Sequence, residues 1–172
     1  MNSSNTTITL ATEHLFLRQF TMDDREDLFK IAQEPDIFQY FPTKTAWELE
    51  RVDRNIQHQI NHWDQFGYGL WAVTLQETGL LMGWCGLEFL PDTNETEVGY
   101  LLSGEFWGKG YATEAARASV EFGKKNIGLK EIIGLTDPLN IASQSVLEKC
   151  GLMFTRQQVY FGMEMFRFAI QA

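Results

Sequence analysis

The chain has 172 residues, 44% of them hydrophobic and 22% charged, which favours a single folded domain over residues 1–172 with a polar, loose tail at residues 1–8. A formal net charge of -9 argues against general nucleic-acid binding, which depends on neutralising phosphates, and is compatible with cationic partners such as amines. The two distant cysteines, Cys85 and Cys150, indicate neither a disulfide framework nor a zinc site, and they fit a reducing cytoplasm. Because no apolar run approaches about 20 residues, we expect no membrane span.

The first half of the chain predicts one strand, two helices and a hairpin. Thr21 followed three residues later by Asp24 is typical of a helix N-terminus, and that helix should end before Pro35. Thr45 and Glu48 repeat the pattern and predict the start of the next helix. The elements are a strand at 14–20, the helix capped by Thr21, a helix from Thr45 with the apolar stripe Val52, Ile56, Ile60 and Trp63, and a hairpin of strands 70–75 and 80–87 around Gly79.

The second half alternates strands and helices. It predicts a turn at 91–94, a strand at 97–102, a helix at 112–126, a strand at 131–135, a helix at 141–150 ended by Gly151, and a final hairpin of 153–161 and 163–170 that breaks at Gly162. The early strands should be antiparallel neighbours, whereas the strand–helix–strand unit in the middle should be parallel and right-handed. Together these elements predict an α+β, or mixed α/β, domain with a central mixed sheet flanked by about four helices.

The segment Trp107-Gly108-Lys109-Gly110-Tyr111-Ala112 joins a predicted strand to a predicted helix. Two glycines one residue apart allow a tight loop that aims successive N–H groups outward, and the helix adds the positive end of its dipole. This geometry suits a phosphate or a pyrophosphate. A plain glycine turn between two elements explains the same residues, so the loop alone leaves both readings open.

More of the chain resembles the GNAT superfamily of acyl-CoA N-acyltransferases, and within it the RimJ/RimL-like branch. The resemblance covers about residues 12 to 170 and rests on segments 12–18, 97–100, 106–115, 140–143 and 146–152. In the family's phosphate-loop pattern, Trp107 replaces the usual Arg or Gln, while Gly110 and Ala112 stand at the other fixed positions. The resemblance implies acetyl-CoA as cosubstrate, no metal, and a primary amine as acceptor, either a protein N-terminus or a small molecule; dimers are common in the family.

The residues also suggest how the cofactor would be held. The N–H groups of residues 108 to 113 could cradle the pyrophosphate, and Lys109 either adds a charge beside it or is a solvated loop lysine. The resemblance implies that main-chain groups of Tyr100 and Leu102 pair with pantetheine, and that Asn140, well placed to cap the following helix, also contacts the cofactor. The predicted cofactor-binding residues are Tyr100, Leu102, Trp107, Gly108, Lys109, Gly110, Tyr111, Ala112, Thr113 and Asn140.

Acyl transfer to an amine requires a base for the amine, donors for the thioester oxygen, and an acid for the thiolate. Glu97 is the candidate base because related enzymes carry a glutamate nearby; a solvent-facing strand glutamate is the alternative. The family tyrosine on the last helix is replaced by Leu147, and Ser143, which matches a serine of RimL-like members, becomes the candidate acid. A first-turn hydroxyl explains Ser143 equally well.

Other functions fit less of the sequence. Loss of the family residues at 107 and 147 raises the alternative of a catalytically weak CoA-binding sensor or interaction module. The glycine loop is one residue short of a dinucleotide fingerprint and lacks its correctly placed acid.

His58 and His62 share a helix face without a third metal ligand, so they would at most touch the acceptor. Trp63, Phe66 and Tyr68 could line the mouth of the same acceptor cleft but fit the core better.

Overall fold

The computed structural model describes residues 8–171, so the tail predicted at residues 1–8 falls outside the described residues except for the exposed Ile8. All predicted helices and strands are present, and one short strand is added at the beginning. The elements are helices α1 (Arg25–Ala32), α2 (Leu49–Phe66), α3 (Tyr111–Phe122) and α4 (Ile141–Lys149), and strands β1 (Leu10–Ala11), β2 (Leu15–Arg18), β3 (Leu70–Leu75), β4 (Leu81–Leu90), β5 (Glu95–Leu102), β6 (Glu131–Thr136), β7 (Met153–Tyr160) and β8 (Met163–Gln171).

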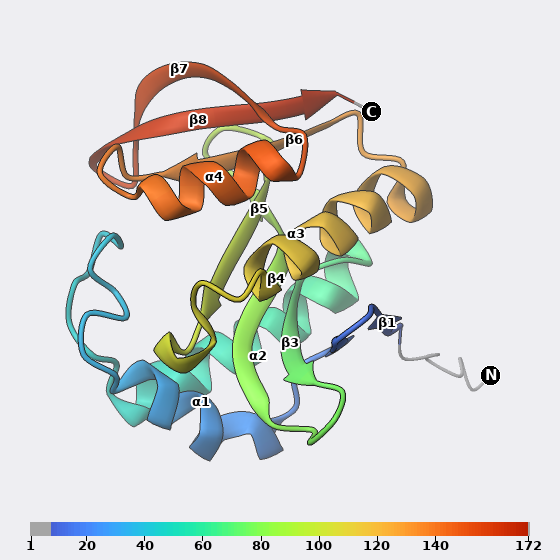
Figure 1. The fold of residues 1–172 in the computed structure, drawn as a ribbon, viewed down its shortest axis with the longest axis vertical. Coiled ribbons are helices and arrows are strands. Elements are labelled where there is room, and N and C mark those ends of the chain that lie inside the picture. Colours follow the sequence, from blue (N-terminus) through green and yellow to red (C-terminus); the bar gives the residue numbers. More distant parts are fainter. Residues whose placement is uncertain (1–7, 172) are drawn as a thin grey trace.

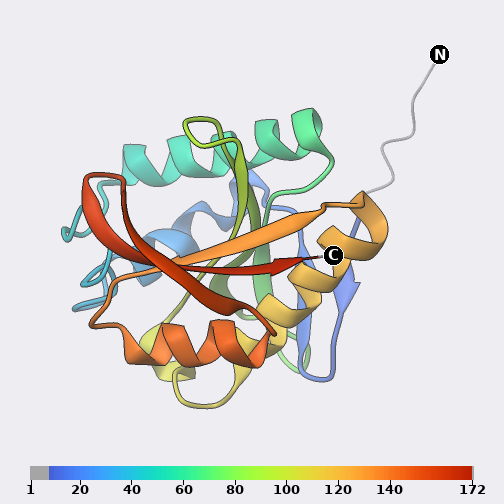
Figure 2. The same cartoon turned by 90° about the horizontal axis from the view of Figure 1, so that it is seen from above.

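The strands form one mixed sheet in the order β1-β2-β3-β4-β5-β6-β8-β7 (Figure 1). Every neighbouring pair is antiparallel except β5 and β6, which are joined through α3 and run parallel. Helices α1 and α2 cover one face of the sheet, and α3 and α4 cover the other (Figure 2). The predicted α+β fold with a mixed sheet is confirmed. Among residues 8–171, none of the helices combines the length and apolar character that crossing a bilayer requires.

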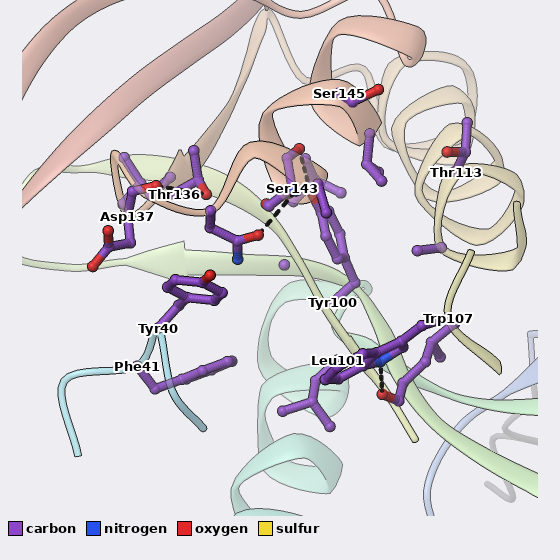
Figure 3. Close-up of a pocket in the computed structure, with 18 of the residues that line it drawn as sticks. Tyr40, Phe41, Tyr100, Leu101, Trp107, Thr113, Thr136, Asp137, Ser143 and Ser145 are labelled. Atoms are coloured by element: carbon purple, nitrogen blue, oxygen red, sulfur yellow. Dashed lines mark hydrogen bonds between the residues drawn. The ribbon is translucent and has the colours of Figure 1, made fainter. Parts of the chain in front are cut away.

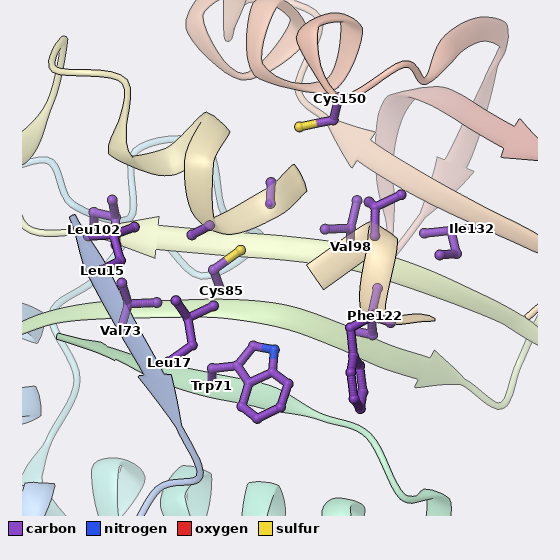
Figure 4. Close-up of a cluster of buried hydrophobic side chains, with 14 of the residues drawn as sticks. Leu15, Leu17, Trp71, Val73, Cys85, Val98, Leu102, Phe122, Ile132 and Cys150 are labelled. Atoms are coloured by element: carbon purple, nitrogen blue, oxygen red, sulfur yellow. The ribbon is translucent and has the colours of Figure 1, made fainter. Parts of the chain in front are cut away.

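Alternation along the strands divides the hydrophobic core between the two faces. Between α3 and the sheet, the core includes Leu17, Trp71 and Val98 from the strands and Phe122 from α3, all nearly inaccessible to solvent (Figure 4). A second cluster lies between the sheet and helices α1 and α2. It contains strand residues whose side chains point to the other face, Ala72, Trp84 and Leu101, and helix residues that pack on them, Leu28, Val52 and Ile56. Because both faces are packed, the strands are fixed in register and can hold a site between them.

Helix α2 begins later than predicted. Thr45 is exposed and lies outside the helix, whose N-cap is Glu48 in an extended conformation. The reason is Trp47, a buried side chain that stacks on Phe38 at 4.8 Å and on Trp84 at 5.5 Å between ring centroids. Burying this large ring stabilises a non-helical path through residues 45–47 and outweighs the local capping pattern.

Strands β5 and β6 separate at the centre of the sheet. On its other side, β5 pairs with β4 along eight residue pairs, from Leu90↔Glu95 to Gly83↔Leu102. Between β5 and β6 the described residues share a single register pair, Glu97↔Ile133. Main-chain groups on this side of β5, beyond Glu97, therefore lack a strand partner, and a slot opens between two central strands.

Candidate active site

A cavity of about 910 Å³ lies where β5 and β6 separate. Its wall contains residues from both faces of β5, namely Glu97, Gly99 and Leu101 on the α1–α2 face and Val98, Tyr100 and Leu102 on the α3–α4 face. The beginning of α3, near Trp107 and Thr113, lies on one side of the cavity, and the loop between α1 and α2, with Tyr40 and Phe41, lies on the other, below the residues that lead into α4 (Figure 3). The cavity thus connects the two faces of the sheet.

The glycine loop forms an open cradle at the beginning of α3. Gly108 and Gly110 have φ of 72° and 88°, in the left-handed region, and Gly110 is the N-cap residue of α3. A Cβ at either glycine would meet no heavy atom within 4 Å. Within residues 8–171, the N–H groups of Gly108 to Thr113 have no hydrogen-bond acceptor, and the helical ladder begins with Glu114 N–H donating to the Gly110 carbonyl at 3.0 Å. Six donors are therefore free for an anion.

Two predicted cofactor residues have unexpected surroundings. The Trp107 indole Nε1–H donates to the Leu102 carbonyl at 2.7 Å, so that oxygen already has a partner. The Lys109 ammonium lies 5.8 Å from the centre of the Phe106 ring, and Lys109 is not among the residues of the cavity wall. All the other predicted cofactor-binding residues line the cavity. The free donors of the cradle are consequently main-chain groups, and the Lys109 ammonium lies beside Phe106.

Tyr100 and Ser143 connect β5 to the first turn of α4. The Tyr100 phenol donates to the Ser143 carbonyl at 3.0 Å, and its oxygen lies 2.8 Å from Ser143 Oγ (Figure 3). Asn140 caps the helix as predicted, with Oδ1 accepting from Ser143 N–H at 3.1 Å. Burial raises the pKa of Tyr100, which keeps the phenol protonated at physiological pH. Leu147 is fully buried against Gly134.

Glu97 lies opposite Glu88 across the β4–β5 pair, and both line the cavity on the α1–α2 face. Burial raises the pKa of Glu97 to about 8, with a further contribution from the charge of Glu88 and an opposing main-chain hydrogen bond from Leu135. Glu88 Oε1 in turn lies 2.7 Å from Nε2 of His58, an exposed side chain on α2. A carboxylate with this pKa is a much better base toward an amine than an ordinary glutamate.

His62 does not reach the cavity. Its Nδ1–H donates to the Tyr68 carbonyl at 2.7 Å, and its Nε2 accepts from the Phe89 N–H at 3.0 Å, so both ring nitrogens are satisfied inside the fold. Burial lowers its pKa accordingly. Trp63 and Tyr68 are buried core residues, and neither they nor Phe66 line the cavity. Among residues 8–171, no group of three or more His, Cys, Asp or Glu side chains could hold a metal ion.

Residues 14–153 match the family described as the acetyltransferase (GNAT) domain. The chain belongs to this family. The YkkB protein of Bacillus subtilis is 31% identical over 155 residues, which cover 86% of each chain. The FsC-acetyl coenzyme A-N(2)-transacetylase of Aspergillus fumigatus is 30% identical over 167 residues, covering 89% of this chain and 67% of that protein.

A solved acetyltransferase structure agrees with the fold. The acetyltransferase of Agrobacterium tumefaciens is 26% identical, covers 100% of this chain and 99% of its own, and superposes with a TM-score of 0.85. The family and its named members place this chain among the acyltransferases.

Sequence reasoning missed part of the GNAT cavity wall. Glu88 could have been found by counting back across the four-residue turn at 91–94, because Leu90↔Glu95 fixes Glu88 opposite Glu97. Tyr40 and Phe41 come from the irregular loop after α1, and no local pattern predicts where such a loop packs.

Proposed function

We propose that this chain is a single-domain N-acetyltransferase that moves an acetyl group from acetyl-CoA to a primary amine by direct attack in a ternary complex. The observation that carries the proposal is the cavity itself. It extends from the open cradle at Gly108 and Gly110, through the slot between β5 and β6, to the raised-pKa carboxyl of Glu97. A phosphate-bearing carrier and an amine can therefore enter from opposite faces of the sheet.

The cradle fits a pyrophosphate. The free N–H groups of Gly108 to Thr113 supply the donors, the positive end of α3 favours negative charge, and the missing Cβ atoms let the anion approach the backbone. The unpaired side of β5 fits the pantetheine arm, because an extended chain with amide groups can add to a free strand edge. Tyr100 retains this role, whereas the Leu102 carbonyl is bound to Trp107. Asn140 lies beside the arm at the start of α4.

Glu97 is the proposed base. It removes a proton from the acceptor ammonium, directly or through a water, so that the amine lone pair can attack the thioester carbonyl. A C–N bond forms, the C–S bond breaks, and the proton is held by Glu97. The pKa of about 8 lies between that of an ordinary carboxyl group and those of alkylamines. Proton transfer from the ammonium to Glu97 is therefore less unfavourable than transfer to an ordinary glutamate.

Ser143 is the proposed acid, acting together with Tyr100. The Ser143 hydroxyl, whose oxygen lies 2.8 Å from the Tyr100 phenol, can give its proton to the departing thiolate. The second proton that the attacking nitrogen loses as the amide forms restores the Ser143 hydroxyl, and the Tyr100 phenol stays protonated and holds the serine in place. Thiols have a pKa of about 8.5, so this step asks little of the acid and its removal costs less than removal of the base.

The finer assignment to the RimJ/RimL-like branch is also proposed, on the segments at 12–18, 97–100, 106–115, 140–143 and 146–152. A cytoplasmic location is proposed because Cys85 and Cys150 are both free and buried, which suits a reducing compartment.

Thiol release from acetyl-CoA in the presence of an amine panel tests the function. The panel should contain small amines and peptides with free N-termini, and mass spectrometry should identify the acetylated product. Amine-dependent release with a mass gain of one acetyl group supports the proposal. Binding of CoA without transfer to any amine would favour the alternative, a CoA-binding sensor.

A further inference from the structure

The cavity has one compartment that the acetyl donor does not need. Odd-numbered residues of β5 face α1 and α2, and even-numbered residues face α3 and α4, yet both sets line the same space. If acetyl-CoA enters at Gly108 and Gly110, as the proposed function holds, the amine must occupy the space on the α1–α2 face. We call this the acceptor compartment, lined by Tyr40, Phe41, Trp84, Glu88, Glu97 and Gly99.

The acceptor compartment is acidic at one end and aromatic along its walls. Glu88 and Glu97 face each other in register at the acidic end. The aromatic wall is held by packing: Phe41 meets Phe38 edge-on at 5.5 Å, and Trp84 stacks at 5.5 Å on the buried Trp47. None of the six residues that line the compartment is basic, and the His58 imidazole, which lies 2.7 Å from Glu88 Oε1, is on the exposed surface of α2 and not in the cavity wall. An ammonium group is therefore favoured at the acidic end, and a flat uncharged body along the walls.

Gly99 gives this compartment its width. A Cβ built on Gly99 meets no heavy atom within 4 Å, and its φ lies outside the left-handed region. Its register partner on β4, Gly86, differs, because a Cβ there would lie 2.3 Å from the Gly69 carbonyl oxygen. Gly86 is thus required by packing. Neither packing nor backbone conformation requires glycine at position 99, and its missing side chain leaves open space between Glu97 and Leu101.

We propose that the acceptor is a small primary amine with one cationic end and a flat apolar body, held with its ammonium against Glu88 and Glu97 and its body over Gly99, and that Gly99 sets the size limit. A polyamine would place further positive charges against apolar walls, which costs desolvation. A peptide would bring unpaired main-chain polar groups to the same walls. The inference rests on the proposed acetyltransferase function and names its substrate class.

The test compares 2-phenylethylamine, spermidine and a free-N-terminus tripeptide as acceptors for the wild type and for Gly99→Ala and Gly99→Leu. We expect the wild type to favour 2-phenylethylamine in kcat/KM by about tenfold or more. Gly99→Leu should raise its KM by about tenfold or more, with Gly99→Ala intermediate, because the new side chain fills the acceptor's space. CoA affinity, measured by calorimetry, and the unfolding temperature should stay close to those of the wild type.

Saturation-transfer NMR between 2-phenylethylamine and the CoA-bound protein gives a readout that needs no turnover, and Gly99→Leu should abolish the signal. Preference for spermidine or the tripeptide, or an unchanged KM in both Gly99 variants, would overturn the inference while the acetyltransferase function stands. If no amine is acetylated, absence of the 2-phenylethylamine NMR signal in the wild type also overturns the inference about the acceptor. Failure of the wild type to bind CoA would instead refute the proposed function. Should Gly99→Leu not fold, Gly99→Ala carries the comparison.

Discussion

The phenol oxygen of Tyr100 and the hydroxyl oxygen of Ser143 lie 2.8 Å apart, linking the central strand β5 to the first turn of α4. The same phenol donates to the Ser143 carbonyl, so the tyrosine is fixed by two contacts with one residue. This arrangement places a protonated hydroxyl pair on the cavity wall beside the slot proposed for pantetheine. Leu147, which stands where the family resemblance implies a tyrosine, is buried and packs against Gly134.

Removal of either hydroxyl should slow turnover modestly. We expect Ser143→Ala and Tyr100→Phe each to lower kcat by about tenfold, below the range of about 10²- to 10⁴-fold typical of general acid–base catalysis, because a thiolate is already a tolerable leaving group. CoA affinity should change by less than about threefold. Tyr160→Phe serves as the matched control, because Tyr160 is a buried tyrosine that bonds Glu95 away from the cavity. Loss of CoA binding in Ser143→Ala would instead identify Ser143 as a cap or cofactor contact.

Glu97→Gln should have a larger effect on catalysis. Removing a general base should lower kcat by about 10²-fold or more at neutral pH. In the wild type, the rate should rise with pH as Glu97 loses its proton near pH 8, and this acidic limb should flatten in the variant. Glu105→Gln is the control, because Glu105 is exposed and lies outside the cavity wall. A wild-type kcat in Glu97→Gln would assign the base role to a water or to another carboxylate.

The raised pKa of Glu97 should also make the folded protein less stable as pH rises. The pKa of Glu97 is raised in the folded state to about 8, whereas in the unfolded chain it is near the ordinary value of about 4.3. Between these values the folded protein holds a proton that the unfolded chain has released, so the free energy of unfolding decreases as pH rises through this window. Gln does not titrate, so Glu97→Gln removes this decrease. In thermal unfolding, the stability of the variant relative to the wild type should therefore increase between about pH 4.5 and pH 8. A stability difference that stays constant across that range would contradict the raised pKa.

The sequence predicted the fold through local signals that the tertiary structure also uses. The capping pattern at Thr21 is realised, since Asp24 Oδ2 accepts from the Thr21 N–H at 2.9 Å, and Asn140 caps α4 through Ser143. The similar pattern at Thr45 failed because Trp47 gains more by stacking in the core than a helical turn would provide. Local propensity is a weak preference, which burial of a large aromatic side chain overrides.

The proposed cofactor end of the site was more predictable than the proposed acceptor end. Gly108 and Gly110 are adjacent in sequence and stand at the start of a helix, so their role can be read locally. The hydrogen bond between Tyr100 and Ser143 joins residues 43 positions apart, and no sequence pattern reports it. Tyr40 and Phe41 depend on how an irregular loop packs against β4 and β5, which only the tertiary structure reveals.

Calorimetric titration of acetyl-CoA into the wild type, Gly110→Pro and Lys109→Ala tests the central claim most directly. Proline fixes φ near −65°, cannot adopt the 88° of Gly110, and removes one cradle N–H, so binding should be lost or weakened by about 100-fold or more in a variant whose unfolding transition confirms that it still folds. Lys109→Ala, next to it but outside the cavity wall, should bind nearly as well as the wild type. Absence of binding to the wild type, or equal affinity in a folded Gly110→Pro variant, would contradict the assignment of this loop as the site of acetyl-CoA.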